Sequence, residues 1–195
     1  GITQTITGLL TSAMKSRMFI ISCITISVMA LTMLVYWIGL QGPFLLDDRP
    51  NIVLPFVKQT GWESFYFAIT HNGSGLLGRS VSIVSLALTG IFYELDPWGY
   101  KFHNLLIHLA TGLLLCRFLW RLLPALTGKA ADNVTLVVAG LTAALWLLHP
   151  LFVSTVLYPV QRMTQLAAFF TLLGLLVYLE VRLAPRWGIR QWAMA

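Results

Sequence analysis

Charge is the property this sequence has least of. Only 10% of its 195 residues are charged, whereas soluble domains usually carry about 25%. The shortage is uneven, because the run from Met18 to Leu46 carries no charge and neither does the run from Asn133 to Gln161. Each run is longer than the roughly 20 residues that a helix needs to cross a bilayer. These gaps exclude an ordinary soluble domain and predict an all-α integral membrane protein, a multispan helical bundle.

Cysteine and metal-binding patterns are also scarce. Cys23 and Cys116 both lie inside apolar segments, where we expect reduced, buried thiols, and no metal-ligand spacing is present. The net charge of +6 does not indicate nucleic-acid binding, because the basic residues flank apolar segments and do not form a patch. We therefore expect membrane lipid, and no nucleic acid, as a partner.

The N-terminal region is typical of a retained signal anchor. Lys15 and Arg17 precede an apolar run that is too long for a signal-peptide core, and no small-x-small cleavage site follows it. We predict residues 1–17 to be a cytoplasmic lead. Because the chain begins at Gly1 and stops just after the basic stretch Arg182 to Arg190, we expect a fragment whose C-terminal remainder is missing.

The apolar pattern predicts a transmembrane module over residues 18–195. We expect full spans at about 18–40, 102–123, 134–148 and 163–183, with a long outer loop at 41–79. The apolar stretch 80–95 is different, because only 14 residues separate Arg79 from Glu94. As a helix they cover roughly 21 Å, less than the roughly 30 Å hydrocarbon core. We interpret this stretch as an interfacial or re-entrant segment.

The distribution of basic residues predicts the orientation. If 80–95 does not cross, one side collects the larger share of them: Lys15, Arg17, Arg117, Arg121, Lys129, Arg182, Arg186 and Arg190. The side richer in lysine and arginine faces the cytoplasm. The N-terminus is then cytoplasmic, and the 41–79 loop and the 149–162 turn share the extracytoplasmic side. Side chains of both segments can therefore converge there: Asp47, Asp48, Arg79, His149 and Arg162.

Asp47 and Asp48 form the sharpest polar feature of the sequence. Charged residues close to a membrane are costly unless they are solvated or functional. A carboxylate there can act as the general base for an acceptor hydroxyl or can bind a divalent cation. The competing interpretation is a solvated turn that ends the first span. The metal, if any, would be held by Asp47 or Asp48.

Arg79 and Arg162 each stand at the outer mouth of an apolar segment. A guanidinium fork suits phosphate oxygens, especially in a partly dry site. The alternative is that each arginine snorkels to the membrane interface, as single arginines usually do. Two of them on the same side as an acidic loop strengthen the functional interpretation, because charged groups gather at sites.

Three further polar residues are candidates for lining a site. Asn104 and His108 are four residues apart on one helix face. An interhelical hydrogen bond explains them more simply than metal ligation does, since no third ligand is apparent in the sequence. His149 precedes Pro150 and is either part of a helix stop or a site-lining imidazole.

Four motifs in order resemble the transmembrane O-mannosyltransferases that carry tetratricopeptide repeats. The segment LLDDRPNI at 45–52 resembles their first outer loop, and Gly78-Arg79-Ser80 resembles their Arg-Pro-Leu stretch. The segment LDPWGYKFHNLLIHL at 95–109 closely resembles their Pro-Trp-Gly-Tyr…Asn-Leu-Leu-x-His-Leu block. His149-Pro150 followed by Gln161-Arg162 resembles their His-Pro…Gly-Arg turn. The likeness covers about residues 40–183.

The resemblance implies a GT-C fold, here its N-terminal module, with re-entrant or interfacial helices in the first outer loop. It implies a membrane glycosyltransferase that moves a sugar from a polyprenyl-phosphate donor to an extracytoplasmic protein or glycan acceptor. Asp47 or Asp48 would then bind metal or activate the acceptor, and Arg79 and Arg162 would hold the lipid phosphate. The remaining positions would line the site: Asn104, His108 and His149.

The sequence also departs from the family pattern. Where relatives often have His-Thr-Glu, this chain has Phe152-Val153-Ser154, and Met163 follows Arg162 where an acidic residue is common. A second carboxylate is therefore missing, no tetratricopeptide repeat is present, and the metal is left open. One alternative is a non-catalytic GT-C-like scaffold that anchors membrane protein partners. A third hypothesis is a lipid or solute transporter, which the absence of a visible inverted repeat disfavours.

Overall fold

The computed structural model describes residues 22–53, 62–63, 66 and 80–184. Within these ranges the regular elements are helices and no β-strand occurs. The N-terminal span, Ser22–Gln41, ends in the short helix η1. The elements in chain order are η1 Ile38–Gln41, η2 Arg49–Val53, α4 Ser80–Tyr93, α5 Pro97–Thr127, α6 Asn133–Leu147, α7 Phe152–Leu157, η3 Pro159–Gln161 and α8 Arg162–Leu183. The all-helical prediction is therefore confirmed.

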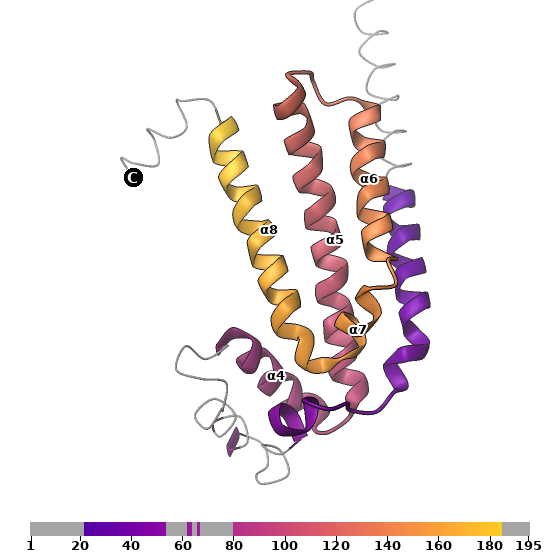
Figure 1. Cartoon of the computed structure of the whole chain (residues 1–195), viewed down its shortest axis with the longest axis vertical. Helices are drawn as coiled ribbons and strands as arrows, with labels where there is room; N and C mark the ends of the chain where they lie inside the picture. Colours follow the sequence, from indigo (N-terminus) through magenta and orange to yellow (C-terminus); the bar gives the residue numbers. More distant parts are fainter. Residues whose placement is uncertain (1–21, 54–61, 64–65, 67–79, 185–195) are drawn as a thin grey trace, which may run out of the picture.

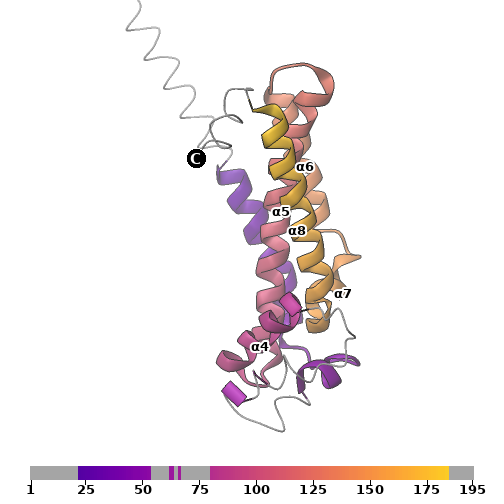
Figure 2. The same cartoon turned by 90° about the vertical axis from the view of Figure 1, so that its left-hand side faces the viewer.

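The helices form an up-and-down bundle around α5 (Figure 1). The N-terminal span and α6 lie on one side of α5 and α8 on the other. The segment 42–53, α4, and the α7–η3 turn all gather at the lower end of the bundle, and the second view confirms this (Figure 2). The two segments that the charge pattern assigned to one side of the membrane therefore do meet. We call this the aspartate end.

Three helices in the described ranges are long and apolar enough to span a membrane: Ser22–Gln41, Pro97–Thr127 and Pro159–Leu183. They correspond to three of the four predicted spans, which supports an integral membrane protein. The predicted lead 1–17 and most of the predicted outer loop lie outside the described residues.

The predicted fourth span forms α6, but this helix has only 15 residues. It covers roughly 22 Å, which is less than the hydrocarbon thickness, so a full crossing by α6 stays a prediction. Helix α4, with 14 residues, is almost as short. The two differ in position, since α6 runs beside α5 whereas α4 lies across the aspartate end (Figures 1 and 2). An interfacial or re-entrant α4 also stays a prediction.

Local sequence signals explain where the central helix begins and ends. The Asp96 side chain accepts a hydrogen bond from the Trp98 backbone N–H at 3.0 Å, and Pro97 occupies the first helical position, where its missing N–H does no harm. The helix ends at Gly128, whose φ of 69° is left-handed and favours glycine. Asp132 caps α6 in the same way through Thr135.

The bundle buries polar groups and exposes apolar ones. A small apolar core joins the N-terminal span, α5, α6 and α7: Tyr36, Leu40, Leu105, Leu109, Leu147 and Val156. Leu34 and Leu145 remain 71% exposed on the outer face, whereas Asp48, Asn104 and Arg162 are 0% exposed. This is the distribution expected of a bundle in a membrane, because lipid solvates apolar side chains while polar groups need partners inside the protein.

Candidate functional site

The two neighbouring aspartates have opposite environments. Asp48 is fully buried, and its carboxylate accepts hydrogen bonds from the backbone N–H groups of Leu45 and Val160, both at 2.8 Å. Leu45 precedes it in a tight turn, which the Asp48 N–H closes by donating to the Leu45 carbonyl at 2.7 Å. Asp48 therefore fastens the start of the outer loop to η3, 112 positions away.

Lys101 reinforces this junction from near the start of α5. Its ammonium donates to the carbonyls of Gly42 and Pro43 at 2.7 and 3.2 Å, and its side chain is only 2% exposed. Burial raises the pKa of the Asp48 carboxyl, while the two N–H donors and the positive charge of Lys101 act in the opposite direction. Burial is the largest of these influences.

Asp47 is exposed at the surface of the same turn. Its backbone N–H donates to the Tyr158 hydroxyl oxygen at 2.9 Å, so a contact from the α7–η3 turn also fixes its position. Only one of the two aspartates thus presents its side chain to the outside. The sequence left this choice open, because both residues have the same chemistry and the same neighbours.

Arg162 is the largest fully buried side chain of the described residues. Its Nε donates to Asn104 Oδ1 at 2.8 Å, and its Nη2 donates to the Tyr100 carbonyl at 2.8 Å. Its Nη1 donates to Thr89 Oγ1 at 2.7 Å and to the Ser85 carbonyl at 3.0 Å. Every nitrogen of the guanidinium is therefore held by an oxygen of the protein, and the fork joins α4, α5 and α8.

Asn104 links this arginine to the turn that carries Tyr158. Its Oδ1 accepts from Arg162, while its Nδ2 donates to the carbonyls of Tyr158 and Pro159 at 3.3 and 3.4 Å. Asp48 reaches the next residue, Val160, from the other side. Together, Asp48, Lys101, Asn104 and Arg162 form one buried polar junction that fixes the loop bearing Asp47.

The two candidate histidines lie in different surroundings. His108 is 2% exposed, bonds through Nε2 to the Leu147 carbonyl at 3.0 Å, and stacks on Trp146 with ring centroids 4.6 Å apart. This is the interhelical hydrogen bond that the sequence favoured. His149 is exposed at the end of α6 and accepts from the Leu151 N–H at 3.3 Å, which fits the helix-stop interpretation. Their hydrogen bonds go to Leu147 and Leu151, which lie outside the buried polar junction.

The structure describes only some of the residues predicted to bind phosphate or metal. Arg79 lies outside the described residues. Arg162 is described, and its contacts favour a positioning role over a direct role in phosphate binding. Among the described residues no group of three or more His, Cys, Asp or Glu side chains could hold a metal ion. Asp48 does not fit as a ligand, because backbone N–H groups occupy both of its oxygens.

The sequence did not predict Lys101 as part of this junction, nor the hydroxyl groups of Tyr158 and Thr89 as partners of Asp47 and Arg162. Lys101 had a readable signal, because it stands three residues before Asn104 and thus on the same helix face. Tyr158 and Thr89 had none, since their partners lie 111 and 73 positions away in the sequence.

Comparison with known proteins supports the resemblance seen in the motifs. The chain is 30% identical over 174 residues to protein O-mannosyl-transferase tmtc2 of Xenopus laevis, and 29% and 28% identical over 171 residues to protein O-mannosyl-transferase TMTC2 of Mus musculus and of Homo sapiens. Each match covers 84% of this chain. No family model matches the sequence, and no solved structure matches it.

The chain spans about a fifth, 19%, of the length of these curated relatives. The similarity nevertheless runs through most of the chain, since each match covers 84% of it. The predicted resemblance is thereby confirmed: this chain is similar over most of its length to proteins named O-mannosyl-transferases.

Proposed function

We propose that the chain forms part of a membrane glycosyltransferase that transfers a sugar from a polyprenyl-phosphate donor to a hydroxyl group of an extracytoplasmic acceptor. The names of the relatives suggest mannose as the sugar and protein as the acceptor. The observation that carries the proposal is the position of Asp47, an exposed carboxylate on a turn held by a buried polar junction. Pre-positioned groups on rigid elements are what catalysis requires.

Asp47 is the aspartate to which we assign the role of general base. It takes the proton from the acceptor hydroxyl, whose oxygen forms the new bond to the anomeric carbon. The bond between that carbon and the phosphate oxygen breaks at the same time, and polyprenyl phosphate leaves with the electron pair. Asp48 is instead a positioning residue, because both of its oxygens are occupied by backbone donors.

The leaving group is already charged, so cationic groups that stabilise it matter more than an acid that protonates it. Arg79 remains our predicted phosphate ligand, and it directly precedes Ser80, the first residue of α4. Arg162 acts indirectly. Its bonds to Thr89, Ser85 and Tyr100 hold α4 to α5 and α8. Arg162 thus holds in place the helix that begins directly after Arg79 in the sequence.

The test is sugar transfer by the intact protein from a mannosyl polyprenyl phosphate, with an acceptor peptide, after Asp47→Asn. We expect kcat to fall at least about a hundredfold while the melting temperature stays within about 2 °C. Asp132→Asn is the matched control, because Asp132 is an exposed aspartate of the α5–α6 loop and asparagine caps a helix equally well. Unchanged turnover in Asp47→Asn would remove the base that we assign.

The same experiment distinguishes the scaffold alternative, which the internally satisfied contacts of Arg162 also allow. A scaffold would show neither turnover nor donor binding in the unsubstituted protein, together with a stable partner on purification. Binding of the lipid-linked donor with an affinity that Arg79→Gln reduces would favour the enzyme.

A further inference from the structure

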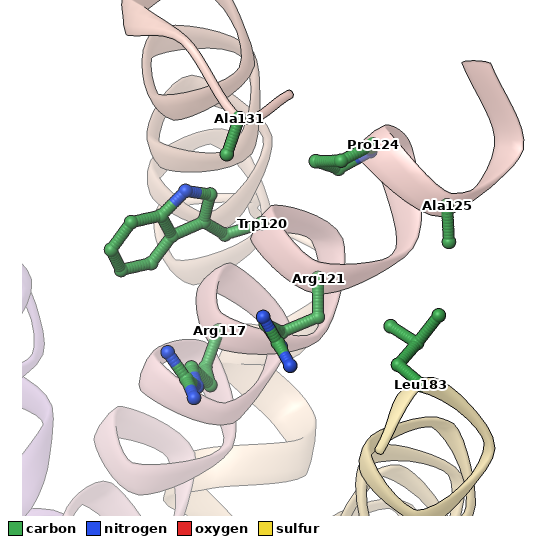
Figure 3. A pocket seen from close by; sticks show the side chains of 7 residues that line it. All are labelled: Arg117, Trp120, Arg121, Pro124, Ala125, Ala131 and Leu183. Carbon is green, nitrogen blue, oxygen red and sulfur yellow. The ribbon is translucent and has the colours of Figure 1, made fainter. Parts of the chain in front are cut away.

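The far end of the bundle holds a cavity of about 420 Å³ that the proposed function does not use. It lies between the C-terminal turns of α5, the loop that follows, and the last turn of α8, at the end opposite to Asp48 (Figures 1 and 3). Arg117, Trp120 and Arg121 line it together with apolar side chains: Pro124, Ala125, Ala131 and Leu183. Its size is within the range of small-ligand sites.

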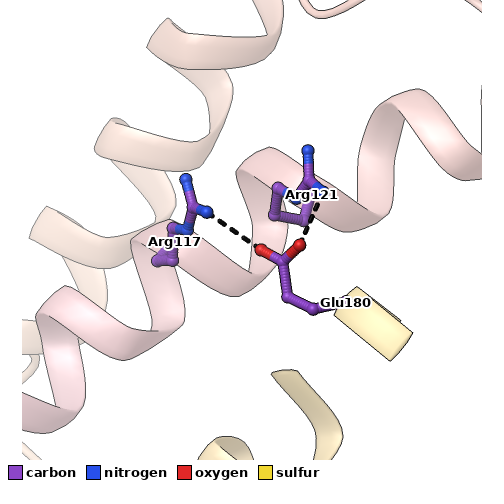
Figure 4. Close-up of polar contacts among 3 residues, drawn as sticks. All are labelled: Arg117, Arg121 and Glu180. Atoms are coloured by element: carbon purple, nitrogen blue, oxygen red, sulfur yellow. Dashed lines mark hydrogen bonds and ion pairs between the residues drawn. The ribbon is translucent and has the colours of Figure 1, made fainter. Parts of the chain in front are cut away.

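The two arginines of the cavity lining form ion pairs with one glutamate, Glu180 (Figure 4). Arg117 Nη2 donates to Glu180 Oε1 at 2.9 Å, and Arg121 Nη2 donates to Glu180 Oε2 at 2.5 Å. Two positive groups share a single carboxylate, so the cluster keeps an excess of one positive charge. We refer to Arg117, Arg121 and Glu180 as the arginine pair cluster.

The donors of the cluster are not all used by the protein. Each guanidinium has five N–H groups, and the hydrogen bonds found for these two arginines in the described part of the chain are the single ones to Glu180. The Nε of Arg121 is buried and has no partner among the described residues. An acceptor oxygen in the cavity would find donors in the N–H groups that Arg117 and Arg121 do not use for Glu180.

The surroundings indicate what kind of acceptor fits. Trp120 lies beneath Arg117, with the guanidinium carbon 5.6 Å from the ring centroid. Tryptophan and arginine near the end of a span are typical of the level of the lipid headgroups. Glu180 stands three residues before the end of α8 at Leu183. With α5 and α8 as membrane spans, we therefore expect the cavity near the level of the lipid phosphate groups, with apolar helix surface alongside for acyl chains.

We propose that this cavity binds the phosphate headgroup of an anionic phospholipid at the membrane face opposite to the aspartates. Guanidinium forks match phosphate oxygens in geometry and charge, and one phosphodiester carries the single negative charge that the arginine pair cluster lacks. One lipid per chain is thus expected. The site is independent of the proposed transferase function, because it lies at the other end of the bundle.

The experiment measures retained lipid and thermal stability of the intact protein in zwitterionic phosphatidylcholine nanodiscs and in nanodiscs that contain phosphatidylglycerol. We expect one phosphatidylglycerol to be retained in native mass spectrometry, and the melting temperature to rise with its mole fraction. The double variant Arg117→Gln/Arg121→Gln should lose at least tenfold in affinity. The matched control is the double variant Lys129→Gln/Arg182→Gln, which removes the same charge from two exposed residues outside the cavity lining.

Two results would overturn the proposal. One is equal retention of phosphatidylglycerol by the double variant and the control, which would reduce the effect to general attraction by positive charge. The other is equal stabilisation by inorganic phosphate or glycerol phosphate in solution, which would assign the cavity to a soluble anion. If the double variant does not fold, Glu180→Gln serves instead, because it leaves both arginines in place and should strengthen lipid binding several-fold.

Discussion

Arginine side chains mark both ends of the bundle, but their surroundings differ completely. At the aspartate end, Arg162 is fully buried, and protein oxygens hold all of its nitrogens. At the other end, the side chains of Arg117 and Arg121 are 49% and 38% exposed and share Glu180 beside a cavity. An arginine whose every nitrogen is held by protein oxygens fixes architecture, whereas one with nitrogens left without a partner can bind a ligand.

This difference also changes how a functional arginine should be sought in a membrane protein. Both ends supply guanidinium groups near apolar spans, and sequence alone favoured Arg162 as the phosphate ligand. The deciding observation is the set of acceptors around each group, since a buried fork already bonded to Asn104, Thr89 and Tyr100 would have to exchange those bonds for phosphate.

The largest expected effect comes from removing the buried fork. Arg162→Met should lower the free energy of unfolding by about 3 kcal/mol or more, because several buried acceptors, including Asn104 Oδ1 and Thr89 Oγ1, lose their donor. Arg162→Lys should recover only part of this, since an ammonium cannot replace a planar fork. Thermal unfolding in one detergent measures both.

The matched substitution at the other end is Arg117→Met. It should change the free energy of unfolding by less than about 1 kcal/mol, because ion pairs of exposed side chains contribute little. Equal destabilisation by Arg162→Met and Arg117→Met would remove the distinction between the two ends.

The next effect separates the two aspartates. Asp48→Ala leaves the N–H of Leu45 and the buried N–H of Val160 without their acceptor and should destabilise the protein by about 2 kcal/mol. Asp47→Ala should cost less than Asp48→Ala, within about 0.5 kcal/mol of neutral, because substitutions of exposed side chains usually change stability little. The measurement is the midpoint of thermal unfolding, and a reversed order would contradict the assignment of roles.

A smaller effect concerns the pH dependence of the aspartate end. The folded-state pKa of Asp48 is raised above its ordinary value of 3.8 because the carboxyl is buried. The folded protein therefore holds this proton to higher pH than the unfolded chain does, and stability falls as pH rises from about 3.8 through the raised pKa.

Asp48→Asn removes this titration, so its melting temperature should depend less on pH across that interval than that of the unsubstituted protein. The comparison of the two curves from about pH 4 to pH 7 tests this. Parallel curves for Asp48→Asn and the unsubstituted protein would show that Asp48 does not titrate with a raised pKa.

The smallest expected effect on stability is at Glu180. Glu180→Gln should change the free energy of unfolding by less than about 0.5 kcal/mol, because the pair is partly exposed. The same change removes the anion that competes with a lipid phosphate, so retention of phosphatidylglycerol should increase. A large loss of stability would instead make the arginine pair cluster a structural element like the buried polar junction.

The sequence predicted the elements well and their lengths less well. Uncharged runs revealed the spans, and Asp96-Pro97 and Gly128 marked the limits of α5, because caps and breakers act on their immediate neighbours. Length did not separate α4 from α6, since they have 14 and 15 residues. The two helices differ instead in how they pack against α5, and this packing depends on residues distant in the chain.

By itself, the sequence determined that this is a helical membrane protein, that its acidic loop and its His-Pro turn face the same end, and which residues there are polar. These properties follow from hydropathy and charge, which add up along the chain. Only the tertiary structure decided that Asp48 is buried while Asp47 is exposed, and that Arg162 is internally satisfied while Arg121 is not. The reason is that hydrogen-bond partners are chosen in space: Asp48 finds Val160 across 112 positions, and no local pattern encodes such a pair.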